Sequence, residues 1–249
     1  MAKNIIPLSE LPVIDKGSDN ISDSGIYQLG AVILMDKPLE WSSFDIVKYV
    51  RSRIPPKKVG HAGTLDPLAT GLLILCSGKA TRTISEIQSL EKTYLAKIRF
   101  GASTPSYDSE TEADEHVEWE HITKQAILEV IEQEFIGTIF QKPPVYSAIK
   151  VKGERLYKKA RKGEDVSLPP RQIEIYSIEI EDISLPDITI KVHCGKGTYI
   201  RSLAHDLGIA LGSRAHLTWL RRTDIGPFSV DNALTPEQFD QQVRIQKNG

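Results

Sequence analysis

The sequence has few of the features that mark secreted or membrane proteins. It contains two cysteines, Cys76 and Cys194, both in apolar, strand-like runs, so we expect buried thiols rather than a disulfide framework. No apolar run reaches the roughly 18 residues that a membrane-spanning helix needs. The N-terminus carries acidic residues and prolines instead of a cationic start and a long apolar core, which argues against a secretory signal. These absences predict a cytoplasmic protein.

The usual signals of a metal or nucleotide site are also missing. The six histidines and two cysteines show neither the HxxxH nor the paired-cysteine spacing of metal ligands. The pair Gly60-x-x-Gly63 is not a phosphate-binding pattern of any strength. We therefore expect no metal and no cofactor, and we disfavour a small-molecule enzyme of mixed α/β fold.

Net charge is close to zero, at −2, but the charges are unevenly placed. Residues 106–134 carry ten acidic side chains and one lysine, whereas residues 142–171 carry nine basic and three acidic ones. A local basic patch is what phosphate binding requires, whatever the charge of the whole chain. The alternative is a solvated charged helix, which occurs in proteins of any function.

Strand and helix patterns are interleaved without a regular β-α-β alternation, which favours a mixed sheet over a doubly wound parallel one. We expect an α+β fold with a mostly antiparallel mixed sheet flanked by helices. Ser43 is the expected cap of the first helix, Ile127, Leu128 and Ile131 should share one helix face, and Thr235 and Gln238 should form a capping box. Strands are predicted at 31–35, 72–76, 92–100, 147–151, 173–183, 188–194 and 217–224. Helices are predicted at 43–53, 80–90, 122–135, 154–161 and 197–211, and after Thr235.

The length and a hydrophobic content of 40% suit one main domain. Residues 1–28 contain Pro7, Pro12, Gly17 and several serines and aspartates, so we expect an irregular or partly ordered N-terminal extension. Residues 29–249 are then expected to form the catalytic domain.

One segment concentrates the candidate chemistry, Gly60-His61-Ala62-Gly63-Thr64-Leu65-Asp66-Pro67-Leu68-Ala69-Thr70-Gly71. It places the carboxylate of Asp66 among small and apolar residues, with His61 five positions earlier. A residue before proline avoids the helical region, so Asp66 is expected on a loop held against the core by the apolar strand that follows. Loops on a rigid scaffold commonly display catalytic groups. The alternative is that Asp66 only closes a turn.

This segment resembles the catalytic motif of the TruB-type tRNA pseudouridine synthases, G-H-x-G-x-L-D-P-x-A-x-G, at every fixed position. Further stretches resemble the same family in the same order, namely Leu34-Met35-Asp36-Lys37-Pro38, Lys92-Thr93-Tyr94, Pro144-Val145-Tyr146-Ser147-Ala148-Ile149-Lys150 and Lys196-Gly197-Thr198-Tyr199-Ile200-Arg201. The resemblance covers residues 30–225 and implies the pseudouridine synthase fold. It also implies the isomerisation of a uridine in RNA, a reaction that needs no metal, redox step or external energy source.

By this resemblance Asp66 is the nucleophile and Arg201 is the cation that keeps it ionised. Burial in a closed pocket would otherwise raise the pKa of the carboxyl group. The alternative is that Arg201 is a helix-surface arginine. Its place near a helix start, where a cation gains nothing from the helix dipole, favours a specific carboxylate partner.

The resemblance also assigns residues that contact the substrate. Tyr94 lies against the target uracil and takes part in proton transfer, Tyr199 lies beside the ion pair, and Leu220 lies on the pocket wall. His61 is inserted into the RNA near the position that the flipped base vacates, which offsets part of the cost of flipping. Taken alone, the tyrosines and the leucine would be core residues, and His61 a satisfied loop histidine.

Lys37, Lys150 and Arg82 are further candidates for phosphate or pocket contacts. The basic segment 142–171 resembles the family's thumb-like insertion, which closes on the RNA arm. Family members often carry a C-terminal RNA-binding module of the PUA type, but only 25 residues follow Asp224, too few for a domain.

The expected lack of this module favours a stand-alone enzyme that acts, without a guide RNA, on the uridine at position 55 in the TΨC arm of tRNA. We also expect a monomer that does not associate with a membrane. A competing hypothesis is an RNA chaperone that opens the tertiary contacts of tRNA without turnover.

Overall fold

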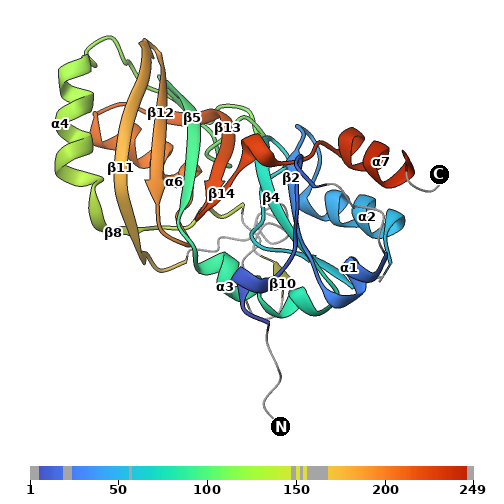
Figure 1. Cartoon of the computed structure of the whole chain (residues 1–249). Helices are drawn as coiled ribbons and strands as arrows, with labels where there is room; N and C mark the ends of the chain where they lie inside the picture. Colours follow the sequence, from blue (N-terminus) through green and yellow to red (C-terminus); the bar gives the residue numbers. More distant parts are fainter. Residues whose placement is uncertain are drawn as a thin grey trace. The chain divides into compact units, whose positions relative to one another are not determined.

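The computed structural model describes residues 6–18, 24–55, 58–146, 150–151, 154–155 and 168–245 (Figure 1). The chain divides into two compact units, here called unit 1 (residues 1–93 and 221–249) and unit 2 (residues 94–220). Strands β5 (Lys92–Phe100) and β13 (Ala215–Ile225) contribute residues to both units.

The remaining elements of unit 1 are η1 (Leu8–Glu10), β1 (Val13–Ile14), α1 (Ser24–Leu29), β2 (Val32–Lys37), α2 (Ser43–Arg53), β3 (Val59–His61), β4 (Ala69–Ser77), η2 (Gly78–Arg82), α3 (Ile84–Ser89), β14 (Phe228–Ser229), η3 (Val230–Asn232) and α7 (Pro236–Ile245). Those of unit 2 are β6 (Ala102–Ser103), β7 (Glu115–His116), α4 (Lys124–Glu134), β8 (Gly137–Gln141), β9 (Lys150–Val151), β10 (Glu154–Arg155), β11 (Arg171–Ser184), β12 (Asp187–Cys194) and α6 (Ile200–Ala210).

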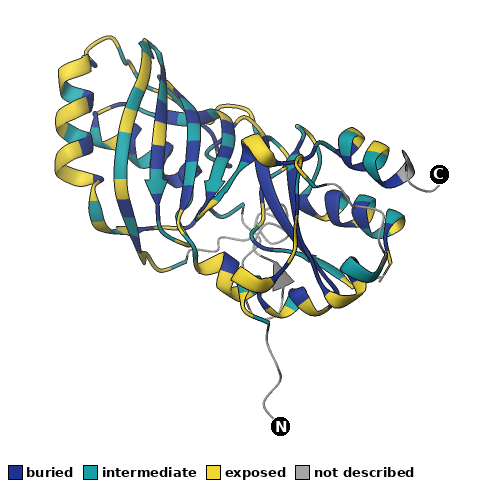
Figure 2. Cartoon of the chain, viewed as in Figure 1, coloured by how far each residue is buried: buried dark blue, intermediate teal, exposed yellow. Residues whose placement is uncertain are grey.

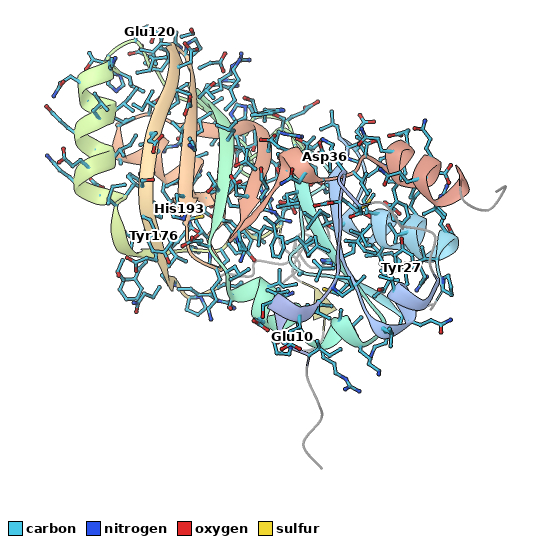
Figure 3. The ribbon with its side chains drawn as sticks, in the orientation of Figure 1. Glu10, Tyr27, Asp36, Glu120, Tyr176 and His193 are labelled. Atoms are coloured by element: carbon cyan, nitrogen blue, oxygen red, sulfur yellow. The ribbon has the colours of Figure 1, made fainter. Side chains whose placement is uncertain are left out.

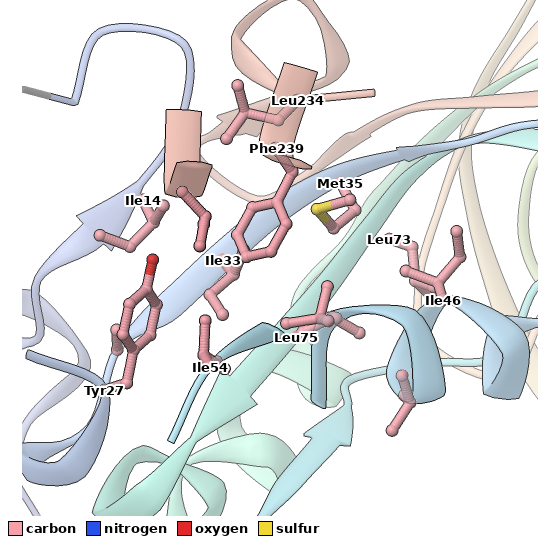
Figure 4. Close-up of a cluster of buried hydrophobic side chains, with 14 residues drawn as sticks. Ile14, Tyr27, Ile33, Met35, Ile46, Ile54, Leu73, Leu75, Leu234 and Phe239 are labelled. Atoms are coloured by element: carbon pink, nitrogen blue, oxygen red, sulfur yellow. The ribbon is translucent and has the colours of Figure 1, made fainter. Parts of the chain in front are cut away.

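Unit 1 is built on β2 and β4, which pair antiparallel and are buried on both faces. On one face, α2 and α7 cover the strands, and a cluster that includes Ile33, Leu75 and Phe239 fills the space between them (Figure 4). On the other face, Val32 and Ile74 pack with residues from η2, α3 and η3. Burial on both faces explains why β4 is a continuous apolar run rather than an alternating one.

The N-terminal residues are more regular than the predicted extension. Strand β1 pairs parallel with β2, and Leu11, Ile14 and Tyr27 are buried in the two apolar clusters of unit 1 or beside them. Residues 8–10, 13–14 and 24–28 form short elements, so this part of the chain is partly ordered rather than irregular throughout. Its prolines and polar residues fall between short elements that are anchored by single apolar side chains.

Helix α2 begins where predicted, but its cap is Ser42 and not Ser43. The Ser42 hydroxyl accepts a hydrogen bond from the Asp45 amide, and the Asp45 carboxylate accepts one from the Ser42 amide, which makes a complete capping box. Ser43 is buried and turns toward a neighbouring loop instead. The second predicted box is confirmed, since Thr235 and Gln238 exchange side-chain to backbone hydrogen bonds of 2.9 and 3.2 Å at the start of α7.

Unit 2 contains a sheet in which β13, β5, β12, β11 and β8 follow one another. The predicted pairing of the strands at 173–183 and 188–194 is confirmed, because β11 and β12 form an antiparallel hairpin, and β8 pairs antiparallel with β11. Helix α4 packs against α6, and its buried residues are Ile127 and Ile131. Leu128 does not share that face and is 41% exposed, because it lies about 100° around the helix from Ile127. The outward face of α4 is correspondingly exposed in Figure 2.

Two other predicted helices differ in the structure. The helix expected at 80–90 divides at Thr83 into the 3₁₀ helix η2 and the short helix α3. Glu154 and Arg155, expected in a helix, form β10 and pair with β9. The rest of that predicted helix, from 156 to 161, lies outside the described residues. The predicted fold class is confirmed, since parallel and antiparallel pairs occur together in an α+β arrangement.

The described part of the chain holds no helix that is long and apolar enough to cross a membrane. Both cysteines are buried and free, as predicted.

Candidate functional site

The loop that carries Asp66 lies in unit 1 and connects β3 to β4. Asp66 is half-buried, between buried Leu65 and exposed Pro67. The main-chain carbonyl of Asp66 accepts a hydrogen bond from the Ala69 amide at 3.0 Å and so closes a turn. The turn needs only this carbonyl, so it does not account for the carboxylate side chain.

Two buried side chains hold the two halves of this loop. The Ser43 hydroxyl donates to the Leu65 carbonyl at 2.9 Å and accepts from the Leu65 amide at 2.8 Å. The Lys37 ammonium is fully buried and donates to the carbonyls of Pro38, Trp41 and Pro67 at 2.9, 2.6 and 3.3 Å. The residues immediately before and after Asp66 are therefore fixed through their backbone atoms.

A third anchor, Arg222, holds the start of the loop. It is 2% exposed and donates to the carbonyls of Leu72 and Gly63 at 2.8 and 3.2 Å. Gly71 allows β4 to lie close to the backbone of Arg222, because a Cβ at this position would be only 2.2 Å from the Arg222 carbonyl oxygen. The neighbouring Arg221 forms a bidentate ion pair with Asp36 at 3.1 and 2.7 Å.

Burial and charge set the protonation of the groups around the loop. Burial lowers the pKa of the Lys37 ammonium to about 8, while the negative charge of Asp66 acts in the opposite direction. Burial and the positive charge of Arg222 lower the pKa of His61, so its imidazole is neutral at pH 7. Asp66 thus lies in the field of a buried cation, and His61 presents an uncharged ring.

Arg201 lies in unit 2, in the first turn of α6, and is 4% exposed. Its guanidinium donates to the carbonyls of Ser106 and Tyr146 at 3.0 and 2.8 Å and lies 3.6 Å from the Asp108 carboxylate. The alternative of a helix-surface arginine is therefore wrong. A buried guanidinium held by fixed carbonyls has a defined orientation.

Sequence reasoning missed Asp108, which is 5% exposed beside Arg201. Its carboxylate accepts hydrogen bonds from the Ser106 hydroxyl at 2.6 Å and the Glu110 amide at 2.9 Å. In the sequence it is one of ten acidic residues between positions 106 and 134. The one available signal was the short polar run from Ser103 to Ser109, in which hydroxyl groups surround the carboxylate.

The other predicted contacts of unit 2 are placed by strands and by a helix start. Tyr94 on β5 and Leu220 on β13 are 9% and 8% exposed. Tyr199 is the N-terminal cap residue of α6, and the Gln141 side chain fixes it by accepting from the Tyr199 amide at 2.8 Å and donating to its carbonyl at 3.0 Å. These positions are equally compatible with packing and with substrate contact.

The three additional cation candidates differ in exposure. Lys37 is fully buried and occupied by backbone carbonyls, so a phosphate contact through its ammonium does not fit its position. Arg82 is exposed at the end of η2. The backbone of Lys150 belongs to β9, but its side chain lies outside the described part of the structure.

The predicted site residues fall into two groups by unit. Asp66, His61, Lys37 and Arg82 belong to unit 1, and Tyr94, Lys150, Tyr199, Arg201 and Leu220 belong to unit 2. The described residues contain no group of three or more His, Cys, Asp or Glu side chains placed to hold a metal ion.

Two family models match the chain in succession. Residues 51–200 match the TruB family pseudouridylate synthase (N terminal domain), and residues 201–249 match the tRNA pseudouridylate synthase B C-terminal domain.

Similar proteins cover nearly the whole chain. The tRNA pseudouridine synthase B of Flavobacterium johnsoniae is 51% identical over 225 residues, covering 88% of this chain and 98% of its own. That of Phocaeicola vulgatus is 50% identical over 226 residues, covering 87% and 96%.

Among solved structures, the archaeal box H/ACA sRNP Nop10-Cbf5 complex contains a chain with 28% identity and a TM-score of 0.66, which covers 89% of this chain. The chain spans 56% of the length of that protein. A second match, an H/ACA RNP bound to a substrate RNA containing 2'-deoxyuridine, has the same identity and TM-score. The fold is thus the predicted pseudouridine synthase fold, the enzyme is an isomerase, and the chain belongs to the TruB family of pseudouridylate synthases.

Proposed function

We propose that this enzyme converts the uridine at position 55 of tRNA, in the TΨC arm, to pseudouridine, with Asp66 as the nucleophile. The observation that carries the proposal is the anchored Asp66 loop, in which Ser43, Lys37 and Arg222 fix the backbone on either side of one half-buried carboxylate. Relatives at about half identity carry the name tRNA pseudouridine synthase B, which supports tRNA as the substrate.

The reaction is an isomerisation, so the substrate and the product contain the same atoms. The bond from ribose C1′ to uracil N1 breaks, the base turns, and a bond from C1′ to C5 forms. The proton on C5 leaves to solvent, and N1 gains a proton. Asp66 adds to C6 of uracil or to C1′ of ribose and is released at the end, so no cofactor is consumed.

The other predicted residues have distinct roles in this scheme. Arg201 keeps the Asp66 carboxylate ionised, which a nucleophile in a closed pocket requires. Tyr94 and Leu220 contact the flipped uracil, Tyr94 takes part in the proton transfer, and Tyr199 lies beside the ion pair. His61 enters the RNA where the base has left, and its neutral ring suits contact with neighbouring bases.

Substrate recognition in this proposal rests on the enzyme alone. The basic segment 142–171 closes on the RNA arm, without a guide RNA or a second subunit, in the cytoplasm where tRNA is processed. Most of that segment, residues 147–149, 152–153 and 156–167, lies outside the described structure. Its role is supported by its charge and by its place between β8 and β11.

Tritium release from C5 tests the proposal directly. An unmodified tRNA transcript labelled with tritium at uracil C5 is incubated with the wild-type protein and with Asp66→Asn, and the position of pseudouridine in the product is mapped. We expect release by the wild type only, together with pseudouridine at position 55, because Asn keeps the shape of the side chain but is a poor nucleophile.

The same experiment separates the competing hypothesis. If both proteins bind the tRNA with equal affinity and neither releases tritium, an RNA chaperone is the better account. Release by Asp66→Asn at the wild-type rate would remove Asp66 from the chemistry.

A further inference from the structure

The segment from Thr104 to Asp108 surrounds one side of the Arg201 guanidinium. The Ser106 carbonyl accepts from Arg201 at 3.0 Å, and the Asp108 carboxylate lies 3.6 Å from the same nitrogen. Internal hydrogen bonds tighten the segment, from the Tyr107 amide to the Thr104 carbonyl at 3.0 Å and from the Thr104 hydroxyl to the Asp108 carbonyl at 2.6 Å. Ser106 and Asp108, which both contact Arg201, therefore flank Tyr107.

Tyr107 has a backbone conformation that tyrosine rarely adopts, with φ of 62°. This left-handed region is disfavoured for residues with a Cβ, and it is populated mainly by glycine, asparagine and aspartate. A residue held there by its surroundings often marks a functional position. Here the reversal at Tyr107 lets the Ser106 carbonyl and the Asp108 side chain face the same guanidinium.

The ring of Tyr107 stacks on the ring of His205, with centroids 3.8 Å apart and planes inclined by 13°. His205 lies four residues after Arg201 on α6, so the two side chains project from the same face of the helix. The stack thus joins the middle of the segment 104–108 to the helix that carries Arg201. A backbone hydrogen bond also joins the segment 104–108 to β13, because the Tyr107 carbonyl accepts from the Leu217 amide at 3.0 Å.

We propose that Tyr107 and His205 are positioning residues for Arg201. Their stacked rings hold the segment 104–108 against α6, so that the Ser106 carbonyl and the Asp108 carboxylate fix the direction of the Arg201 guanidinium. This inference rests on the proposed role of Arg201 in catalysis. It assigns a function to a strained tyrosine and a half-buried histidine that the mechanism itself does not use.

The environment of His205 fits a stacking role better than a proton-transfer role. Its Nδ1 atom is buried and has no hydrogen-bond partner among the described residues. Burial, with the charge of Arg214, lowers the pKa of His205, while Asp114 and Glu115 act in the opposite direction. An uncharged imidazole stacks on a phenol ring without bringing a second cation close to Arg201.

Four variants separate the ring from the backbone conformation. Tyr107→Phe keeps the stack, whereas Tyr107→Asn removes it and places there a residue that tolerates the left-handed conformation. His205→Ala removes the stack from the other side. Tyr176→Asn is the matched control, because Tyr176 also lies against a histidine ring in another part of unit 2. The ring centroids of Tyr176 and His193 are 4.8 Å apart (Figure 3).

The readouts are the single-turnover rate of tritium release at saturating enzyme, the Kd for tRNA and the melting temperature. We expect Tyr107→Asn and His205→Ala each to lower the rate about tenfold with Kd and melting temperature little changed, and their combination to lower it no further. Tyr107→Phe and Tyr176→Asn should retain at least half of the wild-type rate.

A Tyr107→Asn rate within twofold of wild type would overturn the inference, and so would a rate loss that follows a lowered melting temperature. The failure of the proposed function looks different: a wild-type protein that releases no tritium, or an Asp66→Asn variant as active as wild type, removes the catalytic role on which the inference depends.

Discussion

Asp206, on α6 beside His205, is the clearest case in which one side chain opposes stability. Burial raises the pKa of its carboxyl group to about 6, well above the value near 4 of an unfolded chain. Between these two values the folded protein binds more protons than the unfolded one, so this group makes stability fall as pH rises from about 4 to about 6. Above pH 6 the folded state carries a poorly solvated negative charge.

We therefore expect Asp206→Asn to stabilise the protein at pH 7 by about 1 kcal/mol, after allowing for partial exposure, and to have no effect at pH 4. Thermal melts at the two pH values measure this. Asp187→Asn is the opposite control, because Arg99 and Lys97 lower the pKa of Asp187 and its loss should destabilise the protein at pH 7. Equal melting-temperature shifts at pH 7 and pH 4 for Asp206→Asn would contradict the argument.

At the scale of single residues, the sequence pointed to candidate site residues that lie in a dense local motif. Arg201 was found because it follows Gly197-Thr198-Tyr199, and the structure shows it buried, as a specific carboxylate partner would be. Asp108 and Arg222 were not predicted. Their importance comes from groups about 90 and 150 positions away in the chain, and no local pattern reports such contacts.

At the scale of elements, adjacent serines at the start of α2 have separate tasks. Ser42 caps the helix, whereas Ser43 holds the Asp66 loop through both backbone groups of Leu65. The sequence predicted the helix boundaries well, because Ser-rich starts and Pro55 are local signals. It assigned the cap to the wrong serine, since which hydroxyl turns inward depends on a loop twenty residues later.

This division of tasks predicts that two similar substitutions affect different quantities, one the free energy of unfolding and the other the catalytic rate. Ser42→Ala should lower the free energy of unfolding by about 1 kcal/mol and leave the single-turnover rate unchanged. Ser43→Ala leaves the buried Leu65 amide and carbonyl unpaired, so we expect the rate to fall about tenfold. Melting curves and tritium release on both variants measure this, and a rate loss in Ser42→Ala as large as that in Ser43→Ala would refute the separation.

Other elements show the same contrast between local patterns, which the sequence contains, and distant contacts, which it does not. Strand β12 alternates between buried and less buried positions, and its boundaries were predicted nearly correctly because this period of two is present in the sequence. Glu154 and Arg155 carry charges that suit a helix or an exposed strand equally well, and their pairing with β9 decides between the two. Leu128 is apolar but lies off the buried line of α4.

At the scale of the whole molecule, the charge distribution yields a prediction about binding. The net charge of −2 gives no general attraction to RNA, so we expect the affinity to depend on the local excess of bases in 142–171. Lys158 and Lys159 lie in this segment, outside the described residues. Reversing both charges should weaken tRNA binding and flatten the dependence of log Kd on log salt concentration by about 1 to 2 units of slope, since each lost phosphate contact removes about 0.7 to 0.9.

A matched control must change the net charge equally without touching this segment. Lys124→Glu with Lys191→Glu does so, because both lysines are exposed in unit 2 and lie outside residues 142–171. Binding titrations at several salt concentrations should give a wild-type slope for this control and a reduced slope for the Lys158→Glu, Lys159→Glu protein. Equal slopes for the two double variants would mean that affinity follows total charge, and the thumb-like segment would lose its role in holding the RNA.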